Sequence, residues 1–356
     1  MKQLHIFSTT GFVDCFVQLL ERFDCCDDYD VVQINRASFY EKKTIKDLNG
    51  EDIPGGMPDL YAYSKVFVHL LTPTVCEWIA KHPQVRFTWV LYGADVYANP
   101  LVKTPYLLPR SRAFEKRNPQ GLARKAAYFL LKSRVWKQAL RQVDIVLTST
   151  REEFEAVRLL IDIPTAQWGR FYYGKALLDC EKVEGIHSAQ GPIQMMLGNN
   201  ATSSLNHADF LLDQPEQVDR IHWHIPLSYG DKKYRAWLQS EVGHRSDVTF
   251  HLKHRPIEEY TAWINGLHGA VFHNLRPQGL ANFHSHILMG KAVFLHRKNT
   301  IRDHYTGQDL FVPPSDSFQQ HAHQVSERLP WEGNKRALQS FWNMADCKAN
   351  YQEHFS

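Results

Sequence analysis

Residues 269–295, GAVFHNLRPQGLANFHSHILMGKAVFL, predict one β-loop-α-β unit. A short apolar strand over residues 270–273 runs into a polar loop, and an amphipathic helix over about 281–289 follows the loop. Gly290 is a typical helix stop, and a second apolar strand spans 292–296. Strands that alternate with helices in this way are typical of parallel α/β sheets, so this stretch decides the fold class.

The loop of this unit carries the first functional signal. Arg276 and Gly279 come just before the N-terminus of the predicted helix. The exposed N–H groups and the dipole at such a helix end attract anions, and an arginine adds bidentate recognition of phosphate. Near the end of a two-domain α/β chain, this unit indicates a bound nucleotide diphosphate and therefore a nucleotide-linked substrate.

Length and composition agree with a two-domain globular protein. The chain has 356 residues, which is long for one core and comfortable for two domains. Its composition, 44% hydrophobic and 22% charged, excludes general disorder. The formal charge of +3 is too small to imply a nucleic-acid partner, so none is expected.

The cysteines and the apolar runs indicate a cytoplasmic compartment. None of the six cysteines forms a C-x-x-C pair, and the adjacent Cys25 and Cys26 have poor disulfide geometry, so reduced thiols are expected. The N-terminal sequence lacks the continuous apolar run of a signal peptide. No stretch reaches the 18 apolar residues of a membrane span. We therefore predict a cytoplasmic or peripheral enzyme of bacterial type.

Short apolar runs alternate with helical patterns in both halves of the chain, and each half resembles its own doubly wound sheet. The predicted strands are 4–8, 29–35, 65–71, 87–92, 145–149, 193–197, 221–226, 248–252, 270–273 and 292–295. The predicted helices are 12–23, 74–81, 122–142, 152–161, 206–212, 232–242, 257–265 and 281–289.

This alternation predicts two facing Rossmann-like domains with a cleft between them. The first domain is expected over residues 1–182 and the second over 192–330, with the polar stretch 180–191 as the linker. The last segment, 331–356, contains one long predicted helix over 331–351 that packs back on the first domain.

The second half contains a loop suited to phosphate. GNNATSS, residues 198–204, lies between a strand and a helix, and its candidates are Gly198, Asn199, Ser203 and Ser204. Small and hydroxyl-bearing residues at such a turn let the backbone approach a phosphate and supply further donors. An ordinary N-capping loop is the alternative. Open α/β sheets bind ligands at the carboxyl ends of their strands, where the arginine loop also lies.

Two further strand-end loops hold candidates for the nucleotide and the sugar. IPLSYG places Tyr229 before a helix, either as a contact to sugar or phosphate or in a plain connection. HLKHRPIEEY places His254 and Ile257 where backbone groups near them would read a pyrimidine base, with Glu258, Glu259 or Tyr260 near the ribose.

The first half contains two candidate general bases. Asp95, in YGADVY, follows a buried strand, where a carboxylate usually faces the ligand crevice and is placed to deprotonate an acceptor hydroxyl. A turn cap is the alternative role for Asp95. Asp14, in the loop after the first strand, is the rival base, and its alternative role is to favour the dipole of the following helix.

Other chemistries find little support in the sequence. There is no H-E-x-x-H and no Cys/His quartet at zinc spacing, so no metal site is expected despite 19 histidines. The chain has neither a G-x-S-x-G elbow nor a P-loop. The first strand lacks G-x-G-x-x-G, which argues against a dinucleotide dehydrogenase.

The stretch 110–141 is strongly basic. It holds ten Lys or Arg and one acid, Glu115, and aromatic and aliphatic residues alternate with its charges. This pattern favours docking on an anionic membrane surface. An ordinary amphipathic helix that covers the first sheet is the alternative, and a nucleic-acid patch is a weaker third interpretation.

Four sequence blocks together resemble a known family. They are YGADVY after a hydrophobic strand, LGNNATSSLNH, IPLSYG with its KKYRAWLQSEV helix, and RPQGLANFHSHILMGKAVFL. In this order the blocks are similar to the bacterial N-acetylfucosaminyl (4-acetamido-4,6-dideoxygalactosyl) transferases of enterobacterial common antigen and to related surface-polysaccharide enzymes. The resemblance runs from about residue 87 to residue 310.

The resemblance implies a GT-B fold, a TDP-sugar donor, a polyprenyl-diphosphate-linked saccharide acceptor, and neither a metal nor another cofactor. Donor binding would fall to the second domain, where Arg276 would neutralise the leaving diphosphate. The acceptor would approach beside Asp95 or Asp14. The other donor-binding residues that it implies are the 198–204 loop, Tyr229, Gly279, Leu280 and Asn282.

The leading hypothesis is therefore a glycosyltransferase that works as a peripheral protein on the inner face of the bacterial inner membrane. It would move a deoxyamino sugar from TDP to a lipid-linked saccharide. A GT-B-like nucleotide-sugar epimerase or hydrolase is one alternative. A non-catalytic, membrane-associated scaffold for polysaccharide assembly is another.

Overall fold

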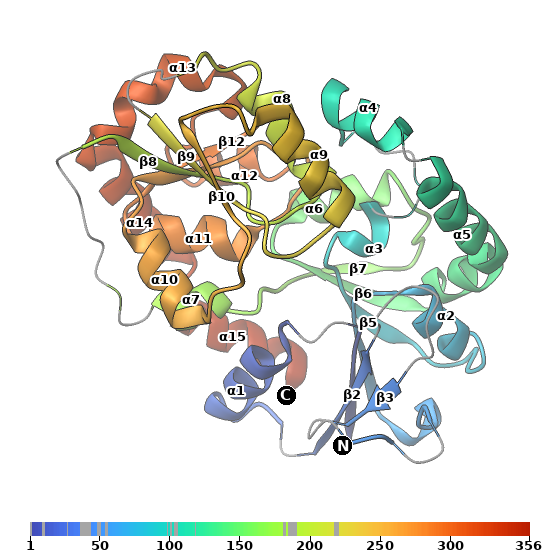
Figure 1. Ribbon diagram of the computed structural model, residues 1–356. Coiled ribbons are helices and arrows are strands. Elements are labelled where there is room, and N and C mark those ends of the chain that lie inside the picture. The colour runs from blue at the N-terminus through green and yellow to red at the C-terminus, as the bar shows by residue number, and fades with distance from the viewer. Residues whose placement is uncertain are drawn as a thin grey trace. The chain divides into compact units, whose positions relative to one another are not determined.

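The protein folds as two compact α/β units (Figure 1). Unit 1 comprises Met1–Thr104, Gln120–Gly174 and Met344–Ser356, and unit 2 comprises Pro105–Pro119 and Lys175–Asn343. The computed structural model describes residues 2–8, 11–26, 28–35, 44–47, 51–53, 56–97, 99, 102, 106–117, 119–180, 183, 191–216 and 221–356.

Unit 1 is built on a seven-stranded sheet in the order β3-β2-β1-β4-β5-β6-β7, which is parallel except for β3. Its strands are β1 (Gln3–Phe7), β2 (Tyr29–Asn35), β3 (Thr44–Lys46), β4 (Lys65–His69), β5 (Phe87–Val90), β6 (Val143–Thr148) and β7 (Gln167–Arg170). Its helices are α1 (Val13–Arg22), α2 (Pro73–Ile79), α3 (Ala94–Tyr97), α5 (Pro119–Leu140), α6 (Arg151–Arg158) and α15 (Met344–Phe355).

Hydrophobic patterning explains how these elements pack. Every residue of β1 is buried, as expected for a central parallel strand with both faces covered. Helix α1 buries one apolar stripe that includes Phe16 and Leu19. The C-terminal α15 covers this stripe: the rings of Phe355 and Phe16 lie 5.1 Å apart, and the Tyr351 hydroxyl donates to the carbonyl of Tyr173 at 3.3 Å.

Unit 2 is built on a five-stranded parallel sheet in the order β10-β9-β8-β11-β12. Its strands are β8 (Ile193–Leu197), β9 (Ile221–Pro226), β10 (Val248–His251), β11 (Gly269–Phe272) and β12 (Ala292–Leu295). Its helices are α4 (Pro109–Arg117), α7 (Lys175–Cys180), α8 (His207–Leu211), α9 (Lys232–Val242), α10 (Ile257–Asn265), α11 (Leu280–Leu288), α12 (Arg302–Gly307), α13 (Phe318–His321) and α14 (Arg328–Phe341), with 3-10 turns η2 (Ser203–Leu205), η4 (Ser315–Ser317) and η5 (Ala322–Ser326).

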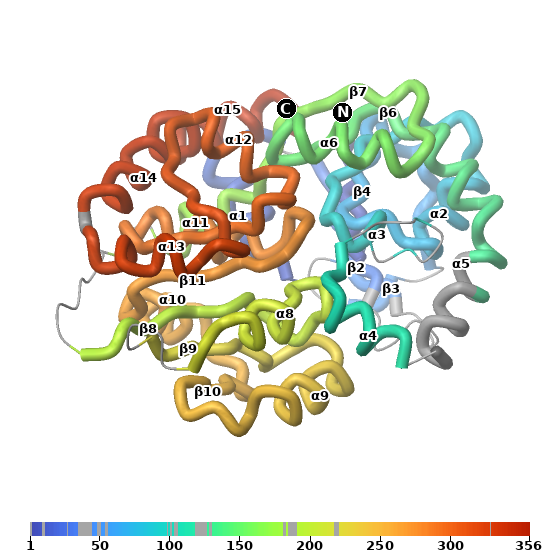
Figure 2. Tube along the Cα trace, turned by 90° about the horizontal axis from the view of Figure 1, so that it is seen from above, coloured from blue at the N-terminus to red at the C-terminus, as the bar shows by residue number. Residues whose placement is uncertain are grey.

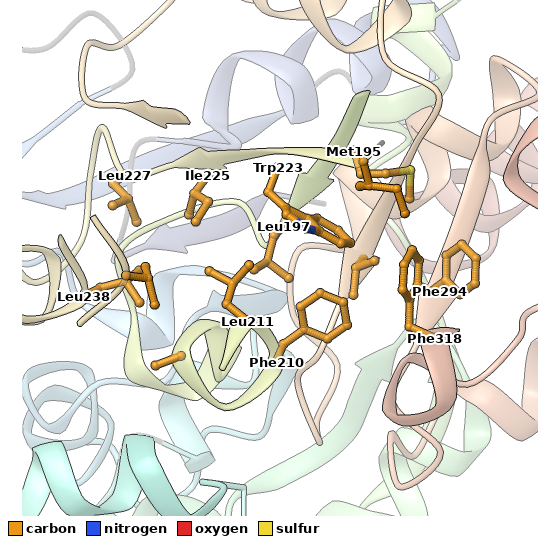
Figure 3. Packing of buried hydrophobic residues seen from close by; sticks show 14 of the residues in the cluster. Met195, Leu197, Phe210, Leu211, Trp223, Ile225, Leu227, Leu238, Phe294 and Phe318 are labelled. Atoms are coloured by element: carbon orange, nitrogen blue, oxygen red, sulfur yellow. The ribbon is translucent and has the colours of Figure 1, made fainter. Parts of the chain in front are cut away.

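An aromatic cluster forms the core on one face of this sheet (Figure 3). Phe210 of α8, Trp223 of β9 and Phe318 of α13 pack edge to face, with ring centroids 5.0 to 5.6 Å apart. Leu197 and Phe294, from β8 and β12, extend the cluster. Such edge-to-face pairs add to the stabilisation from buried apolar area.

Helix α4 joins unit 2 although it precedes the last part of unit 1 in sequence, and it lies beside α8 (Figure 2). The Asp209 carboxylate accepts from the backbone N–H groups of Arg110 at 2.7 Å and Ser111 at 2.9 Å. A carboxylate at a helix N-terminus satisfies the N–H groups that have no partner within the helix. The helix is therefore anchored by a residue about a hundred positions further along the chain.

The ten predicted strands and eight predicted helices are all present, and the β-loop-α-β unit is confirmed. The units depart from the predicted domain ranges in three places, the first being that unit 2 resumes at Lys175 and so includes α7, which was predicted in the first domain. Residues 105–119 lie in unit 2, and residues 331–343 do as well. The single long helix predicted over 331–351 is wrong, because the chain leaves the helical conformation at Trp342 (φ −144°, ψ 80°). The predicted linker, 180–191, falls mostly outside the described residues.

Candidate functional site

The phosphate-binding candidates of unit 2 meet where the strand order changes direction. The chain runs outward from β8 to β10 on one side and from β11 to β12 on the other, so β8 and β11 are neighbours. Ligands of open α/β sheets bind at this kind of switch point, beyond the carboxyl ends of the strands. The loop after β8 (198–204) and the loop after β11 (273–279) both begin there.

Gln278 joins the two loops. Its amide oxygen accepts from the Ser204 hydroxyl at 2.7 Å, and its amide nitrogen donates to the Thr202 hydroxyl at 2.9 Å. The predicted Ser204 thus lies at the centre of the site. Gln278 itself was not predicted as a site residue, although it stands in the quoted RPQG motif.

Arg276 is the cation of this site. Its Nη2 donates to the Ser204 hydroxyl at 3.4 Å and its Nη1 to the carbonyl of Pro277 at 3.3 Å. The guanidinium lies 5.8 Å from the ring centroid of Tyr106, a cation–π distance. These contacts hold a half-buried positive charge beside the hydroxyl groups of the 198–204 loop.

The N-terminus of α11 adjoins this charge. Gly279 is its N-cap with φ +72°, a left-handed conformation that glycine adopts without strain, and no side chain caps the helix. A Cβ at Gly279 would stand 3.1 Å from the Asn199 side-chain oxygen, so a larger residue would crowd that loop. The N–H groups of the first turn, from Leu280 onward, are therefore available to an acceptor from outside the helix.

Two buried asparagines that the sequence analysis missed hold the arginine loop in shape. The Asn274 amide donates to the carbonyl of Arg276 at 2.5 Å. The Asn299 amide donates to the carbonyls of Asn274 at 2.9 Å and Arg276 at 3.2 Å. Both lie in the loops that follow buried strands, Asn274 two residues after β11 and Asn299 four residues after β12, and this position was the available signal.

Gly198 has a structural role that differs from the predicted one. Its φ is +62°, and a Cβ there would come within 2.3 Å of the His207 Nε2 atom. The space above this glycine is thus filled by a buried imidazole of α8, whose Nδ1 pairs with the Tyr234 hydroxyl at 3.1 Å. The missing side chain admits His207 at this position.

The IPLSYG loop pairs with the 198–204 loop. Ala201 and Gly230 form a parallel bridge, and a Cβ on Gly230 would collide with the Ala201 carbonyl at 2.5 Å. The Asn199 amide donates to the Tyr229 hydroxyl at 3.2 Å, while the Tyr229 side chain as a whole is 54% exposed. The structure thus brings Asn199 and Tyr229 together and leaves an aromatic face open to a ligand.

The β10–α10 loop presents the residues predicted for the base. His254 is exposed, and Ile257 is 46% exposed at the first position of α10. Leu252, which was not predicted, is also an exposed large hydrophobic residue. The Tyr260 hydroxyl donates to the Asn282 side-chain oxygen at 2.6 Å, which joins α10 to α11.

Ser203 contacts the neighbouring helix α4. Its hydroxyl donates to the carboxylate of Glu115 on α4. The contact ties η2 to α4, so a structural role for this side chain accounts for its position.

Asp95 in unit 1 is enclosed. It lies on α3 with 6% of its surface exposed, and its Oδ2 accepts from the Trp89 indole N–H at 2.7 Å and the Leu71 N–H at 3.2 Å. Burial raises the pKa of Asp95 to about 6, and these hydrogen bonds oppose the rise. The expectation of a carboxylate that faces a ligand crevice does not match this burial.

Asp14, the rival base, lies in the first turn of α1 and is exposed. A carboxylate at that position also favours the helix dipole. Its side chain is open to solvent in unit 1, in contrast to that of Asp95.

The basic stretch is divided between two helices. α4 belongs to unit 2, whereas almost all of α5 belongs to unit 1. Leu130 and Leu131 of α5 are exposed, and Trp136 is buried. The side chains of residues 119–126, 128 and 129 lie outside the description. No helix among the described residues has both the length and the hydropathy needed to cross a membrane.

All six cysteines are free thiols. Across the described part of the chain, no three His, Cys, Asp or Glu side chains are grouped so as to hold a metal ion.

Comparison with known proteins gives matches in structure. No protein-family model matches the chain, and no curated protein matches it in sequence. Sucrose-phosphate synthase from Thermosynechococcus elongatus is 12% identical, with a TM-score of 0.65 over 99% of this chain and 98% of that one. S. aureus MnaA in complex with UDP is 12% identical, with a TM-score of 0.51 over 99% and 93%. α,α-Trehalose 6-phosphate synthase from Burkholderia multivorans is 10% identical, with a TM-score of 0.51 over 82% and 68%.

The chain has the GT-B fold. The predicted fold class, α/β with two Rossmann-like units, is thereby confirmed. At these identities the likeness is one of GT-B architecture, and the chemistry has to be argued from the side chains of the site.

Proposed function

We propose that this protein is a glycosyltransferase that moves a deoxyamino sugar of the N-acetylfucosamine type from a TDP-sugar to a polyprenyl-diphosphate-linked saccharide. The observation that carries the proposal is the junction of Arg276, Ser204 and the uncapped α11 N-terminus at the switch point of unit 2. The four-block resemblance to N-acetylfucosaminyltransferases supports the particular sugar and acceptor.

The site residues fit the charge that such a transfer develops. The bond between C1 of the sugar and the diphosphate oxygen breaks, a bond from the acceptor oxygen to C1 forms, and the acceptor hydroxyl loses its proton. Negative charge accumulates on the departing diphosphate, where Arg276 and the N–H groups of the first α11 turn would stabilise it. The exposed Tyr229 and Ile257 offer apolar contact to the nucleoside.

Of the two candidate bases, Asp14 is the exposed one and is retained in the proposal. Asp95 is assigned a positioning role, because its carboxylate is enclosed and already accepts two hydrogen bonds. A lipid-linked acceptor also calls for membrane proximity, and we assign that contact to the basic stretch 110–141, which exposes Leu130 and Leu131.

A thermal-shift screen with TDP, UDP and GDP tests the nucleotide site. We expect TDP to raise the melting temperature, since a ligand at a hundred times its Kd stabilises by about 2.7 kcal/mol. Arg276→Ala should weaken TDP binding by about 10- to 100-fold, the loss expected for a hydrogen bond to a charged group. Arg336→Ala, at an exposed position of α14, is the matched control and should bind as the wild type does.

Two outcomes would contradict the proposal in different ways. If none of the three nucleotides stabilises the wild type, the nucleotide site fails and the scaffold alternative gains. If Arg276→Ala binds TDP and transfers sugar as the wild type does, the role of this arginine fails. Turnover of donor without acceptor would favour an epimerase or hydrolase, and the putative UDP-N-acetylglucosamine 2-epimerase from Listeria monocytogenes shares the fold with a TM-score of 0.51.

A further inference from the structure

A pocket in unit 2 has His273, the first residue of the loop after β11, in its wall. It has a volume of about 160 Å³ and opens at the carboxyl ends of β11 and β12. We call it the His273 pocket; its walls include His273, His296, Ser315, Asp316, Phe210 and Asp209. None of its lining residues belongs to the 198–204 loop or to residues 274–279.

Two buried imidazoles dominate this pocket. His273 and His296 directly follow β11 and β12, each is 5% exposed, and their ring centroids lie 4.8 Å apart. The Nδ1 of His296 accepts from the Lys298 N–H at 3.1 Å, so a neutral ring carries its proton on Nε2. The Nδ1 of His273 pairs with the Ser315 hydroxyl at 2.8 Å. No other described residue bonds the Nε2 atom of either ring, so both atoms remain for a ligand.

The imidazoles are neutral at physiological pH. Burial lowers the pKa of His273 to about 3 and lowers the pKa of His296 as well, although Asp316 opposes both shifts. Neutral rings can donate or accept single hydrogen bonds without a formal charge. This is the behaviour needed to recognise hydroxyl groups.

The carboxylates and the apolar walls narrow the class of ligand. Asp209 is saturated by the N-terminus of α4, and Asp316 accepts from the Arg297 N–H at 3.1 Å and pairs with that side chain. Asp213 is a third carboxylate in the wall, and three carboxylates around one pocket disfavour a phosphate. Phe210 supplies an aromatic wall, and hydroxyl acceptors, neutral donors and an aromatic face together suit a polyhydroxylated ring.

We propose that the His273 pocket is a saccharide subsite that binds one pyranose ring of a substrate through its hydroxyl groups. Its volume is close to the roughly 150 Å³ of an engineered cavity that holds benzene, another six-membered ring. The inference deepens the proposed function and rests on it for the identity of the substrate.

The position of the pocket fits this assignment. Arg276 lies three positions after His273, so their Cα atoms lie within about 11 Å of each other. A sugar carried by a diphosphate, or one that accepts transfer beside it, has to lie within this range of the phosphate-binding arginine. The buried Asn206 links the two features, because its amide donates to the His273 carbonyl at 3.1 Å and to the Ser204 carbonyl at 3.2 Å.

Saturation-transfer NMR with the methyl glycosides of N-acetylglucosamine and fucose tests the pocket directly. We expect transfer to the ring protons in the wild type and its loss in His296→Leu. His296→Gln, whose amide N–H stands near the position of Nε2, should restore part of the signal. His323→Leu, at an exposed position of η5, is the matched control. No transfer in the wild type, or equal transfer in His296→Leu, would overturn the proposal.

Displacement identifies the source of the ring. If TDP-glucose removes the glycoside signal and TDP does not, the pocket holds the donor sugar. If the signal persists with either compound, it holds the acceptor saccharide. Displacement by TDP itself would place the nucleotide there and overturn the assignment. Circular dichroism and TDP affinity of the variants report whether unit 2 is intact.

These readouts separate the two proposals. Glycoside binding by a protein that binds no nucleotide would leave the pocket standing and remove the proposed function. TDP binding without glycoside binding would do the reverse.

Discussion

At the scale of single residues, Asp95 holds a strained turn. Leu70, the residue after β4, has φ +73°, a conformation that costs a non-glycine residue of the order of 1 kcal/mol or more. The next N–H, that of Leu71, donates to Asp95, and the Leu70 N–H donates to the Val90 carbonyl at 3.3 Å. The turn lies at the β1–β4 switch point of unit 1, so Asp95 positions backbone where a ligand of this unit would bind.

The raised pKa of Asp95 gives a prediction with a definite sign. The folded state binds the proton more tightly than the unfolded chain, whose pKa is 3.8, so the contribution of Asp95 to the unfolding free energy falls as the pH rises from about 4 to 6. Asp95→Asn removes this pH-dependent contribution to the unfolding free energy, because an amide does not titrate. The stability of the wild type relative to the variant should therefore fall by up to about 3 kcal/mol between pH 4 and pH 7.

Urea unfolding of both proteins at the two pH values measures this difference, and the buried histidines cancel because both proteins contain them. A difference that stays constant with pH would show that Asp95 ionises as freely in the fold as in the unfolded chain. Loss of turnover without loss of stability would instead return Asp95 to the role of base.

Some features of the candidate site could be predicted from the sequence at the level of single residues, and others could not. Strand-end positions were predictable, because parallel strands place their carboxyl ends at one edge, and Arg276, Ser204 and Tyr229 do lie there. Partners from distant segments were not predictable. Gln278 bonds the hydroxyls of Thr202 and Ser204 more than 70 residues earlier in the chain, and no local pattern predicts such a contact.

At the scale of elements, a directed chain of hydrogen bonds crosses the unit 2 sheet. The Gln194 side-chain oxygen accepts from the His224 Nε2 at 2.6 Å, so the His224 Nδ1 must accept from the His251 Nε2 at 2.9 Å. The His251 Nδ1 in turn accepts from Arg255 at 3.0 Å, and this guanidinium lies 4.6 Å from the Trp263 ring centroid. Strands β8, β9 and β10 thus hold the loop proposed to read the base.

Breaking this series of hydrogen bonds should change nucleotide binding without changing turnover. His224→Leu removes the imidazole between Gln194 and His251. The Gln194 side-chain oxygen and the His251 Nε2 then lose their partner, which costs about 1–3 kcal/mol of stability. The released Arg255 should let the β10–α10 loop move, and we expect Kd for TDP to rise several-fold while turnover at saturating donor stays unchanged. Calorimetry and steady-state kinetics measure the two quantities.

A neighbour on the same strand provides the control. His222 bonds the Thr249 hydroxyl at 2.7 Å and makes no hydrogen bond to Arg255. His222→Leu should lose comparable stability and keep the wild-type Kd. Equal changes in Kd for the two variants would mean that general destabilisation is responsible.

Elements were the most predictable level, because apolar periodicity is local. The helix predicted over 331–351 is the exception, because α14 ends at Phe341 without a proline or glycine there. Trp342 is buried, with its ring 4.1 Å from that of His284 on α11. A tertiary contact therefore overrides a helical pattern that the sequence shows as continuous.

At the scale of the whole molecule, the chain passes between the units four times. It enters unit 2 at residues 105–119, returns to unit 1, enters unit 2 again at Lys175 and ends in unit 1. The short segment 105–119 is held in unit 2 because Asp209 and Asn206 accept hydrogen bonds from the start of α4 and the residue before it. Since these partners lie about a hundred residues away, the sequence pattern alone placed α4 in the first domain.

Histidines buried in both units should make the protein unstable in acid. Burial lowers the pKa of His5, His207 and His273 to about 3 and that of His286 to about 4, against 6.5 for an unperturbed histidine. A lowered pKa means that the fold holds these rings neutral. Their contribution to stability is complete above pH 6.5 and is lost as the pH falls toward the folded pKa values.

Each such ring changes the unfolding free energy by about 1.4 kcal/mol per pH unit, so the four together give roughly 5 kcal/mol per pH unit between pH 6 and pH 4. We expect cooperative acid unfolding in this range, followed by tryptophan fluorescence, with hydrogen exchange reporting each unit separately. His286→Leu should reduce the slope for unit 2 by about 1.4 kcal/mol per pH unit, because it removes one titrating group and keeps an apolar side chain on α11. The slope for unit 1, which contains His5, should not change; stability that is flat from pH 7 to pH 5 would contradict the buried neutral state of these rings.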